Sequence, residues 1–211
     1  KSIFNIKFDL TNNNYNLGDI NFNKIYYCIG NFGIQYCNDN ILKSRNFNID
    51  LTFKFLDHYI KKNKKIFIFS SSQVFSHSKK KYNSEKSKVN SAIEMGQQKI
   101  TLENFIQKST NNFAIIRLGK VISFKDTFFS NLINSLKNNK EIELYKDYFF
   151  SPISIKFLNN CLFNNEFTNI VHLSGARNIS YYKFGIELAR KFNFSESLII
   201  PKKIDEENNL F

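Results

Sequence analysis

The stretch Lys64–Ser72, with the sequence KKIFIFSSS, decides the fold class of this 211-residue chain. Its four consecutive apolar residues, Ile66–Phe69, leave neither face of the predicted strand polar. A strand that is apolar on both faces is typical of a parallel sheet buried between helices. The serines that follow it would lie at the carboxyl end of the strand, where ligands bind in open α/β sheets.

Strand-like and helix-like segments alternate on either side of this stretch. Apolar runs predict further strands at residues 3–10, 25–29, 113–117, 142–145 and 169–175. Apolar residues three or four apart predict helices at residues 47–62, 92–107, 128–139, 153–164 and 180–193. Ser180 is placed to cap the last of these helices, and the polar residues 76–90 predict a loop. The alternation favours an α/β fold, in which helices cover both faces of a largely parallel sheet.

The bulk composition argues against several functional classes. Apolar residues make up 42% of the chain and charged residues 23%, as in ordinary globular proteins, and no apolar run approaches the length of a membrane span. The net charge of +12 would suit a nucleic-acid binder. However, only four of the thirty basic residues are arginine, and the wealth of Lys, Asn, Ile and Phe reflects AT-rich codons, so we expect no nucleic-acid partner.

The cysteines and histidines show no metal-ligand spacing. The three cysteines are Cys28, Cys37 and Cys161, and the three histidines are equally scattered. Neither a zinc pattern nor a disulfide framework can be built from them. We therefore expect no metal site, and we expect reduced thiols in a cytoplasmic protein.

A second stretch, Ser91–Ile100 with the sequence SAIEMGQQKI, carries residues that point to chemistry. Gly96 and Lys99 form a Gly-x-x-Lys step on a predicted helix, and Met95 precedes the glycine. Residues four apart lie on one face of a helix, so Met95 and Lys99 should face the same way. Ser71 would add a hydroxyl from the neighbouring strand end.

Eight segments carry a resemblance to a known family in the same order along the chain. They are FDLTN (8–12), YYCIGN (26–31), NIDLTFKFLDHYI (48–60), IFIFSSSQVF (66–75), MGQQKITLE (95–103), IIRLGKVI (115–122), DYFFSPISIKFL (147–158) and VHLSGARNISYYKFGIELA (171–189). Together they resemble the extended short-chain dehydrogenase/reductases, the NAD-dependent epimerase/dehydratase group that acts on sugar nucleotides, with the dTDP-4-dehydrorhamnose reductases as the most similar branch. The resemblance implies a Rossmann-like, N-terminally incomplete NAD(P)-binding domain at residues 1–122. It also implies a small substrate-side subdomain at residues 123–211.

The resemblance also implies roles for individual residues. Ser71 and Lys99 would be catalytic, and Met95 stands at the position of the acid–base tyrosine. The cofactor would be NAD or NADP, and the residues implied in binding it are Asp9, Leu10, Cys28, Ile29, Gly30, Asn48 and Lys99. The substrate would be a nucleotide sugar of surface-polysaccharide metabolism, and the residues implied in binding it are Gln73, Lys120 and Pro152. A homodimer is a further expectation.

Two departures from the family pattern bear on activity. Carbonyl reduction needs a proton donor at the oxygen and a hydride partner at the carbon. A lysine ammonium brings a phenol toward its working pKa, but a methionine thioether carries no proton to donate. The family's G-x-x-G-x-x-G loop, on which the pyrophosphate rests, would precede Phe8 and does not occur in these residues, so we expect the natural protein to begin earlier.

The sequence leaves alternatives open. The chain is either an NAD(P)-dependent nucleotide-sugar epimerase, dehydratase or reductase, or a degenerate relative that kept the fold as a binding or structural module. Tyr82 offers a replacement phenol, although a loop role suits its polar segment better. Arg117 would suit either a phosphate or a buried ion pair.

Overall fold

The structure, a computed structural model, describes residues 8–12, 14–17, 20–30, 33–76, 83–124 and 126–204. They divide into two compact units. The first holds the described residues up to Arg117 together with Phe167–His172, and the second holds Leu118–Glu166 and the described residues from Leu173 onward. The cofactor-side and substrate-side roles expected for residues 1–122 and 123–211 stay predictions.

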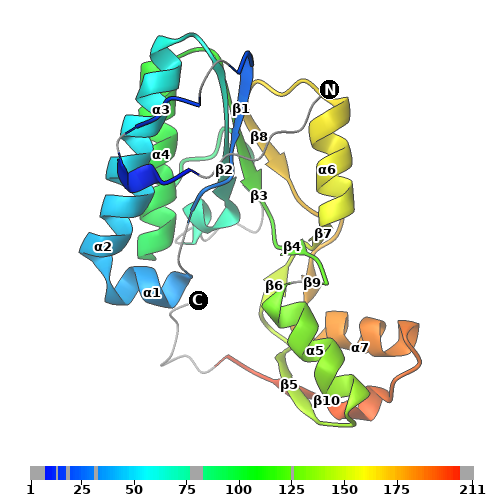
Figure 1. Ribbon diagram of the computed structural model, residues 1–211. Helices are drawn as coiled ribbons and strands as arrows, with labels where there is room; N and C mark the ends of the chain where they lie inside the picture. Colours follow the sequence, from blue (N-terminus) through cyan, green and yellow to red (C-terminus); the bar gives the residue numbers. More distant parts are fainter. Residues whose placement is uncertain are drawn as a thin grey trace. The chain divides into compact units, whose positions relative to one another are not determined.

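A parallel four-stranded sheet organises the first unit (Figure 1). Its strands follow the order β1-β2-β3-β8 and span Lys24–Tyr27, Lys65–Ser71, Phe113–Leu118 and Asn169–Leu173. β1 pairs in parallel with β2, so that Ile25 lies opposite Ile66. This arrangement confirms the predicted α/β, Rossmann-like fold class.

The helices α2, α3 and α4 lie along one side of the sheet, to its left in Figure 1. The helical segments are α1 (Ile34–Asp39), α2 (Ile41–Arg45), the π-helical turn η2 (Asn46–Leu51), α3 (Thr52–Lys61) and α4 (Glu94–Ser109). Short 3-10 turns, η1 (Leu10–Asn12) and η3 (Ser72–Phe75), complete the unit. The core between helices and sheet includes the fully buried Leu56, Ile66, Ile68, Ile106 and Ile115.

Two expectations about the first unit need correction. The predicted helix at residues 47–62 exists, but the helical region begins earlier, at Ile34, and α1 and α2 were not predicted. The predicted strand at residues 3–10 does not extend to its end, because Leu10 begins a 3-10 turn. Residues 3–7 of that strand, and Tyr82 in the polar loop, lie outside the described residues.

The described residues of the second unit include three α-helices and a parallel strand pair, and its core lies among two of these helices and both strands. Its core includes Leu132, Leu136, Leu144, Leu188 and Ile199. The larger elements are α5 (Thr127–Lys137), β5 (Ile142–Tyr145), α6 (Ile155–Asn164), α7 (Tyr181–Lys191) and β10 (Ile199–Lys202), with β10 parallel to β5. The shorter elements are β4 (Val121–Ile122), β6 (Phe149–Phe150), β7 (Ile153–Ser154), β9 (Ile179–Ser180) and η4 (Glu196–Leu198).

Side-chain caps fix where the helices of the second unit begin. Asp126 accepts a hydrogen bond from the Phe129 amide at 3.0 Å and caps α5. Ser180 accepts one from the Lys183 amide at 3.2 Å, which confirms it as the cap of α7. Such caps satisfy amides that the first helical turn leaves without partners.

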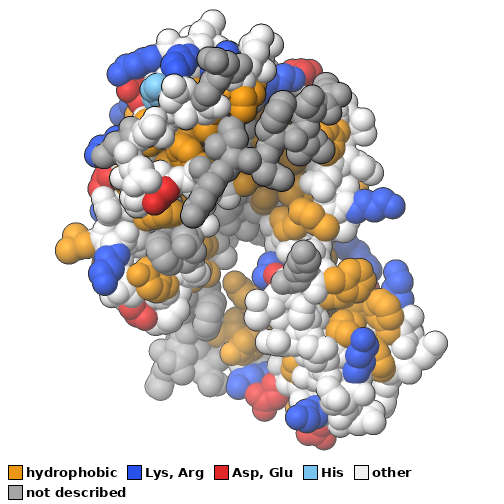
Figure 2. Space-filling view, in the orientation of Figure 1, with side chains coloured by type: hydrophobic (Ala, Val, Ile, Leu, Met, Phe, Trp, Pro, Cys, Tyr) orange, Lys and Arg blue, Asp and Glu red, His pale blue; other side chains and the backbone are white. Residues whose placement is uncertain are grey.

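Basic side chains do not gather into one large patch on the face that Figure 2 draws. Figure 2 shows Lys and Arg side chains scattered singly or in small groups among neutral ones. Within the described ranges, no helix is both long enough and apolar enough to cross a membrane.

Candidate functional site

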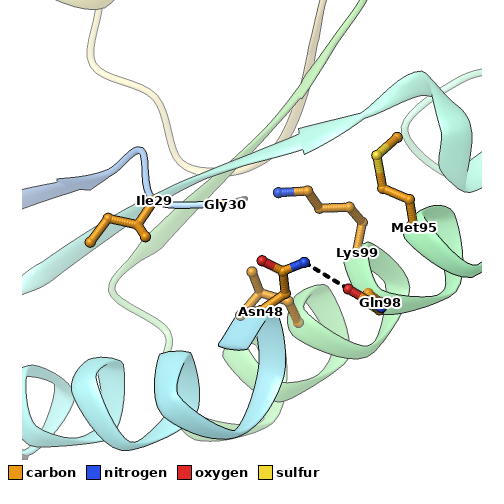
Figure 3. Close-up of a pocket in the computed structure, with 7 residues that line it drawn as sticks. Ile29, Gly30, Asn48, Met95, Gln98 and Lys99 are labelled. Carbon is orange, nitrogen blue, oxygen red and sulfur yellow. Dashed lines mark hydrogen bonds between the residues drawn. The ribbon is translucent and has the colours of Figure 1, made fainter. Parts of the chain in front are cut away.

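A small cavity lies in the first unit, beside the carboxyl end of β1. Its volume is about 110 Å³. Three elements line it: Ile29 and Gly30 follow β1, Asn48 comes from η2, and α4 contributes the rest, namely Met95, Gln98, Lys99 and Leu102 (Figure 3). The spacing of 95, 99 and 102 places these side chains on one side of α4. The cavity thus unites the predicted residues Ile29, Gly30, Asn48, Met95 and Lys99.

Lys99 is held in this cavity by the backbone of β2. Its Nζ donates a hydrogen bond to the carbonyl oxygen of Phe69 at 3.0 Å, two residues before Ser71. A Cβ placed on Gly30 would lie 3.5 Å from the same Nζ, so the amine faces the chain that follows β1. Burial lowers the pKa of Lys99, and the nearby Glu103 and Cys37 oppose that shift.

A network of hydrogen bonds holds the two polar lining residues Asn48 and Gln98 in place. The Asn48 Nδ2 donates to Gln98 Oε1 at 2.8 Å, and the Gln98 Nε2 donates to Ser44 Oγ at 2.8 Å and to Glu94 Oε1 at 3.0 Å. Arg45 holds the other end, donating to both carboxylate oxygens of Glu94 at 2.6 and 3.0 Å. Burial raises the pKa of Glu94, but the hydrogen bonds from Arg45 and Gln98 outweigh it, so the pKa lies below its ordinary value.

Gly96 lets α4 approach the turn that follows β2. A Cβ there would lie 2.1 Å from Ser91 Oγ and 2.5 Å from the backbone oxygen of Gln73. Ser71 caps that turn, because its Oγ accepts a hydrogen bond from the Gln73 amide at 3.2 Å. The glycine of the Gly-x-x-Lys step is therefore a packing requirement that sets the distance between α4 and the Ser71 turn.

The substitution Gly96→Ala is expected to destabilise the chain. Alanine favours a helix over glycine by about 1 kcal/mol, but the clash with a backbone oxygen should outweigh this gain, for a net loss of about 1–3 kcal/mol. The denaturant midpoint measures the effect. Gly33→Ala is the matched control, since no atom of the described residues lies within 4 Å of its Cβ position, and it should change stability by less than about 0.5 kcal/mol. Equal effects of the two substitutions would refute this packing argument.

The other predicted cofactor residues, Asp9, Leu10 and Cys28, are not among the described residues that line the cavity. The Asp9 Oδ1 accepts hydrogen bonds from the Thr11 amide at 2.9 Å and the Thr11 hydroxyl at 2.7 Å. Leu10 is 4% exposed and packs in the core. Cys28 is exposed, just beyond the end of β1. Their proposed roles in cofactor binding stay predictions.

Two of the predicted substrate residues belong to the second unit. Lys120 pairs with Asp126 at 3.2 Å, and its carbonyl accepts a hydrogen bond from the Ile153 amide. The Pro152 backbone oxygen would lie 2.1 Å from a Cβ on Gly175, so only glycine fits there without displacing Pro152. Their roles, like that of Gln73, stay predictions.

Arg117 forms the buried ion pair that was one of its two predicted roles. Its Nη2 lies 2.6 Å from Glu103 Oε2, and both side chains are almost fully buried, with 4% and 1% exposed. The same guanidinium contacts the Glu85 carbonyl at 3.3 Å and lies over the Phe75 ring. Arg117 is therefore committed to structure within the first unit.

Sequence reasoning missed Gln98 and Leu102 as lining residues. Leu102 carries a signal, because it continues the helical face of Met95 and Lys99 three residues on. Gln98 carries none, since its contacts with Asn48 and Ser44 join residues about fifty positions apart. In the described part of the chain, no group of three or more His, Cys, Asp or Glu side chains could hold a metal ion.

The residues of this arrangement supply hydrogen-bonding groups, but Met95 supplies no proton donor. Lys99 supplies an amine, Asn48 an amide and Ser71 a hydroxyl at the neighbouring turn. Met95 lines the cavity where the family resemblance places a phenol, and its thioether is at best a weak acceptor. The cavity therefore has hydrogen-bonding groups for a ligand, and none of the described residues that line it is a tyrosine.

The fold is Rossmann-like, and it agrees with membership of the short-chain dehydrogenase/reductase class. A family model described as the RmlD substrate binding domain matches residues 44–209. The chain belongs to this family, which comprises NAD(P)-dependent sugar-nucleotide reductases and epimerases. Comparison with curated proteins finds no significant match.

Solved structures share this fold at low sequence identity. A dTDP-4-dehydrorhamnose reductase from Clostridium acetobutylicum is 19% identical, with a TM-score of 0.77 over 87% of this chain and 66% of its own. The Bacillus anthracis reductase, solved with NADP, is 18% identical with a TM-score of 0.79 over 86% and 66%. A UDP-N-acetylglucosamine 4-epimerase from Methanobrevibacter ruminantium, bound to UDP-N-acetylmuramic acid, is 14% identical with a TM-score of 0.82 over 95% and 69%. The chain thus spans about two thirds of the length of these relatives.

Proposed function

We propose that this protein binds a nucleotide sugar and turns it over slowly, as a degenerate member of its family. The observation that carries the proposal is that Met95 lines the cavity beside Lys99. The family resemblance gives this position to the acid–base tyrosine. Lys99, Asn48 and Ser71 can still orient hydroxyl and carbonyl groups of a sugar through hydrogen bonds. Binding therefore survives where proton transfer is lost.

The dinucleotide of the family fits this chain only in part. The Lys99 amine and the Asn48 amide are suited to ribose hydroxyls, and NAD or NADP would supply a hydride when bound. A cavity of about 110 Å³ holds a ring-sized fragment and is smaller than the pockets of about 300–1,000 Å³ that enclose drug-sized ligands. The residues of this cavity would thus hold one end of the cofactor.

Titration of the 211-residue chain with NADH and NADPH is expected to show weak binding. The chain carries no G-x-x-G-x-x-G loop whose amides would hold the pyrophosphate. We expect a Kd near or above ~1 mM, which corresponds to about 4 kcal/mol of binding free energy. Calorimetry provides the measurement. Micromolar binding would mean that another element holds the pyrophosphate.

An active reductase or epimerase is the second candidate. The retained Lys99, Asn48 and Ser71 favour it, because these groups would still align a substrate with a cofactor. In that case another group would carry the proton, and the protein would serve nucleotide-sugar metabolism for surface polysaccharide in the cytoplasm. The experiment that separates the two candidates is turnover of a nucleotide-sugar panel by the gene product, with heat of binding measured on the same sugars.

A further inference from the structure

Gln98 is a buried residue of α4 whose side-chain amide contacts three other side chains. It is 3% exposed. Its Nε2 donates to Glu94 Oε1 at 3.0 Å and to Ser44 Oγ at 2.8 Å, and its Oε1 accepts from Asn48 Nδ2 at 2.8 Å. An amide nitrogen carries two hydrogens, and these two acceptors use both. The contacts therefore fix which end of the Gln98 amide faces Asn48.

Neither acceptor of the Gln98 nitrogen can reverse its role. Arg45 donates to both oxygens of the Glu94 carboxylate, at 2.6 and 3.0 Å. Burial raises the pKa of Glu94, but the hydrogen bonds from Arg45 and Gln98 bring it below its ordinary value, so at neutral pH this carboxylate only accepts. The Ser44 hydroxyl donates its hydrogen to the Ile41 carbonyl at 3.0 Å, so toward Gln98 it also acts as an acceptor.

The fixed orientation of Gln98 determines that of Asn48. An amide oxygen accepts and cannot donate, so Asn48 must turn its nitrogen, and not its oxygen, toward Gln98 Oε1. Figure 3 shows this arrangement, with the Asn48 oxygen on the side of its amide that faces away from Gln98. Since Asn48 lines the cavity, the group that it offers to a ligand there is its amide oxygen.

We propose that Gln98 is a positioning residue, which holds Asn48 so that a ligand in this cavity must bring a hydrogen-bond donor to it. A ribose hydroxyl is such a donor, whereas a phosphate or carbonyl oxygen is not. The inference rests on the proposed function, which gives this cavity to one end of NAD or NADP. The family resemblance gives the position of Met95, in the same cavity, to the acid–base group, so the ribose concerned is that of the nicotinamide, which carries the hydride.

Binding of reduced nicotinamide mononucleotide (NMNH) and of its 2′-deoxy and 3′-deoxy analogues tests the need for a donor. Each probe is titrated to millimolar concentration into the 211-residue chain, and binding is followed through NMR shifts of the side-chain amides. At least one deoxy analogue should bind about three- to tenfold more weakly than NMNH, as expected for the loss of one hydrogen bond. Equal affinities of the three probes, or no saturable shift with NMNH, would overturn the proposal.

Gln98→Met separates positioning from a merely structural role. Methionine has a similar length but cannot orient Asn48, so NMNH should bind about three- to tenfold more weakly, while binding of the sensitive deoxy analogue changes by less than about twofold. Gln107→Met, at an exposed position of the same helix, is the matched control and should leave both affinities unchanged. An equal loss for both probes would show that Gln98 only supports the fold, and would overturn the proposal.

Glu94→Gln provides a second, milder variant in case Gln98→Met does not fold, which circular dichroism checks. An amide at position 94 can donate as well as accept, so it loosens the orientation of Gln98, and the preference for NMNH over the deoxy analogue should fall by about twofold or more. An unchanged preference would contradict the proposal. Selective binding of NMNH without binding of any nucleotide sugar would refute the proposed function and leave the role of Gln98 standing. Nucleotide-sugar binding with equal affinities of the three probes would do the reverse.

Discussion

The substitution Met95→Tyr is expected to raise the rate of hydride transfer between NAD(P)H and a nucleotide sugar by about 10²–10⁴-fold, or roughly 3–5 kcal/mol of barrier. The new phenol would lie on the cavity face of α4, four residues before Lys99. Its proton would be available to a substrate oxygen, and the Lys99 charge would favour the phenolate. The measurement is NAD(P)H oxidation by the gene product in its full encoded length, over a panel of nucleotide sugars.

Met95→Phe is the matched control for this gain. Phenylalanine has the bulk of tyrosine without its hydroxyl, so any cost of packing a ring beside Leu102 and Ile29 is shared by both variants. Only the tyrosine variant should gain activity. An equal gain in Met95→Phe would assign the effect to cavity shape, and no gain in Met95→Tyr, with nucleotide-sugar binding intact, would refute the lost-phenol explanation.

Glu103→Gln is expected to lower the free energy of unfolding by about 3–5 kcal/mol, more than Gly96→Ala. The Glu103 carboxylate is 1% exposed and receives two hydrogen bonds from Arg117, at 2.6 and 3.0 Å. Removing its charge leaves the Arg117 guanidinium buried without its counter-charge. Denaturant unfolding followed by circular dichroism measures the loss.

Two controls separate this buried pair from ordinary charge effects. Asp57→Asn removes the carboxylate of an exposed pair with Lys61 on α3 and should cost only about 0.3–0.5 kcal/mol. Replacing both partners, Glu103→Leu with Arg117→Met, should recover much of the stability, because no unpaired charge remains. A loss in Glu103→Gln no larger than that in Asp57→Asn would contradict the assignment of Arg117 to a structural pair.

The sheet of the first unit was predictable because its strands carry their own signal. The apolar run Ile66–Phe69 forms the middle of β2, and 113–117 forms most of β3. α1 and α2 carry no such signal, since the side chains they bury are the small Cys37 and Ser44. These helices are held through polar contacts to α4, such as Ser44 with Gln98, and contacts between distant residues leave no local periodicity.

Most residues that line the candidate site could be predicted from the sequence, but the contacts between them could not. Helical spacing predicted that Met95 and Lys99 share one face, and the family resemblance implied Ile29, Gly30 and Asn48 as residues of the same site; all five line the cavity. The volume of the cavity and the part of Gln98 in it depend on how η2 packs against α4, which no segment of sequence specifies alone. The Gly96 contacts likewise follow from the path of the chain at Ser91.

The most direct test of binding with slow turnover is to measure both on one sample. Each nucleotide sugar of the panel is titrated calorimetrically into the gene product, and NAD(P)H oxidation or epimer exchange is then followed in the same cell. We predict saturable binding of at least one sugar, weakened by Lys99→Met and Ser71→Ala, with turnover about 10²–10⁴-fold below that of Met95→Tyr. Robust turnover in the unmodified protein, undiminished by Lys99→Met and Ser71→Ala, would contradict the account.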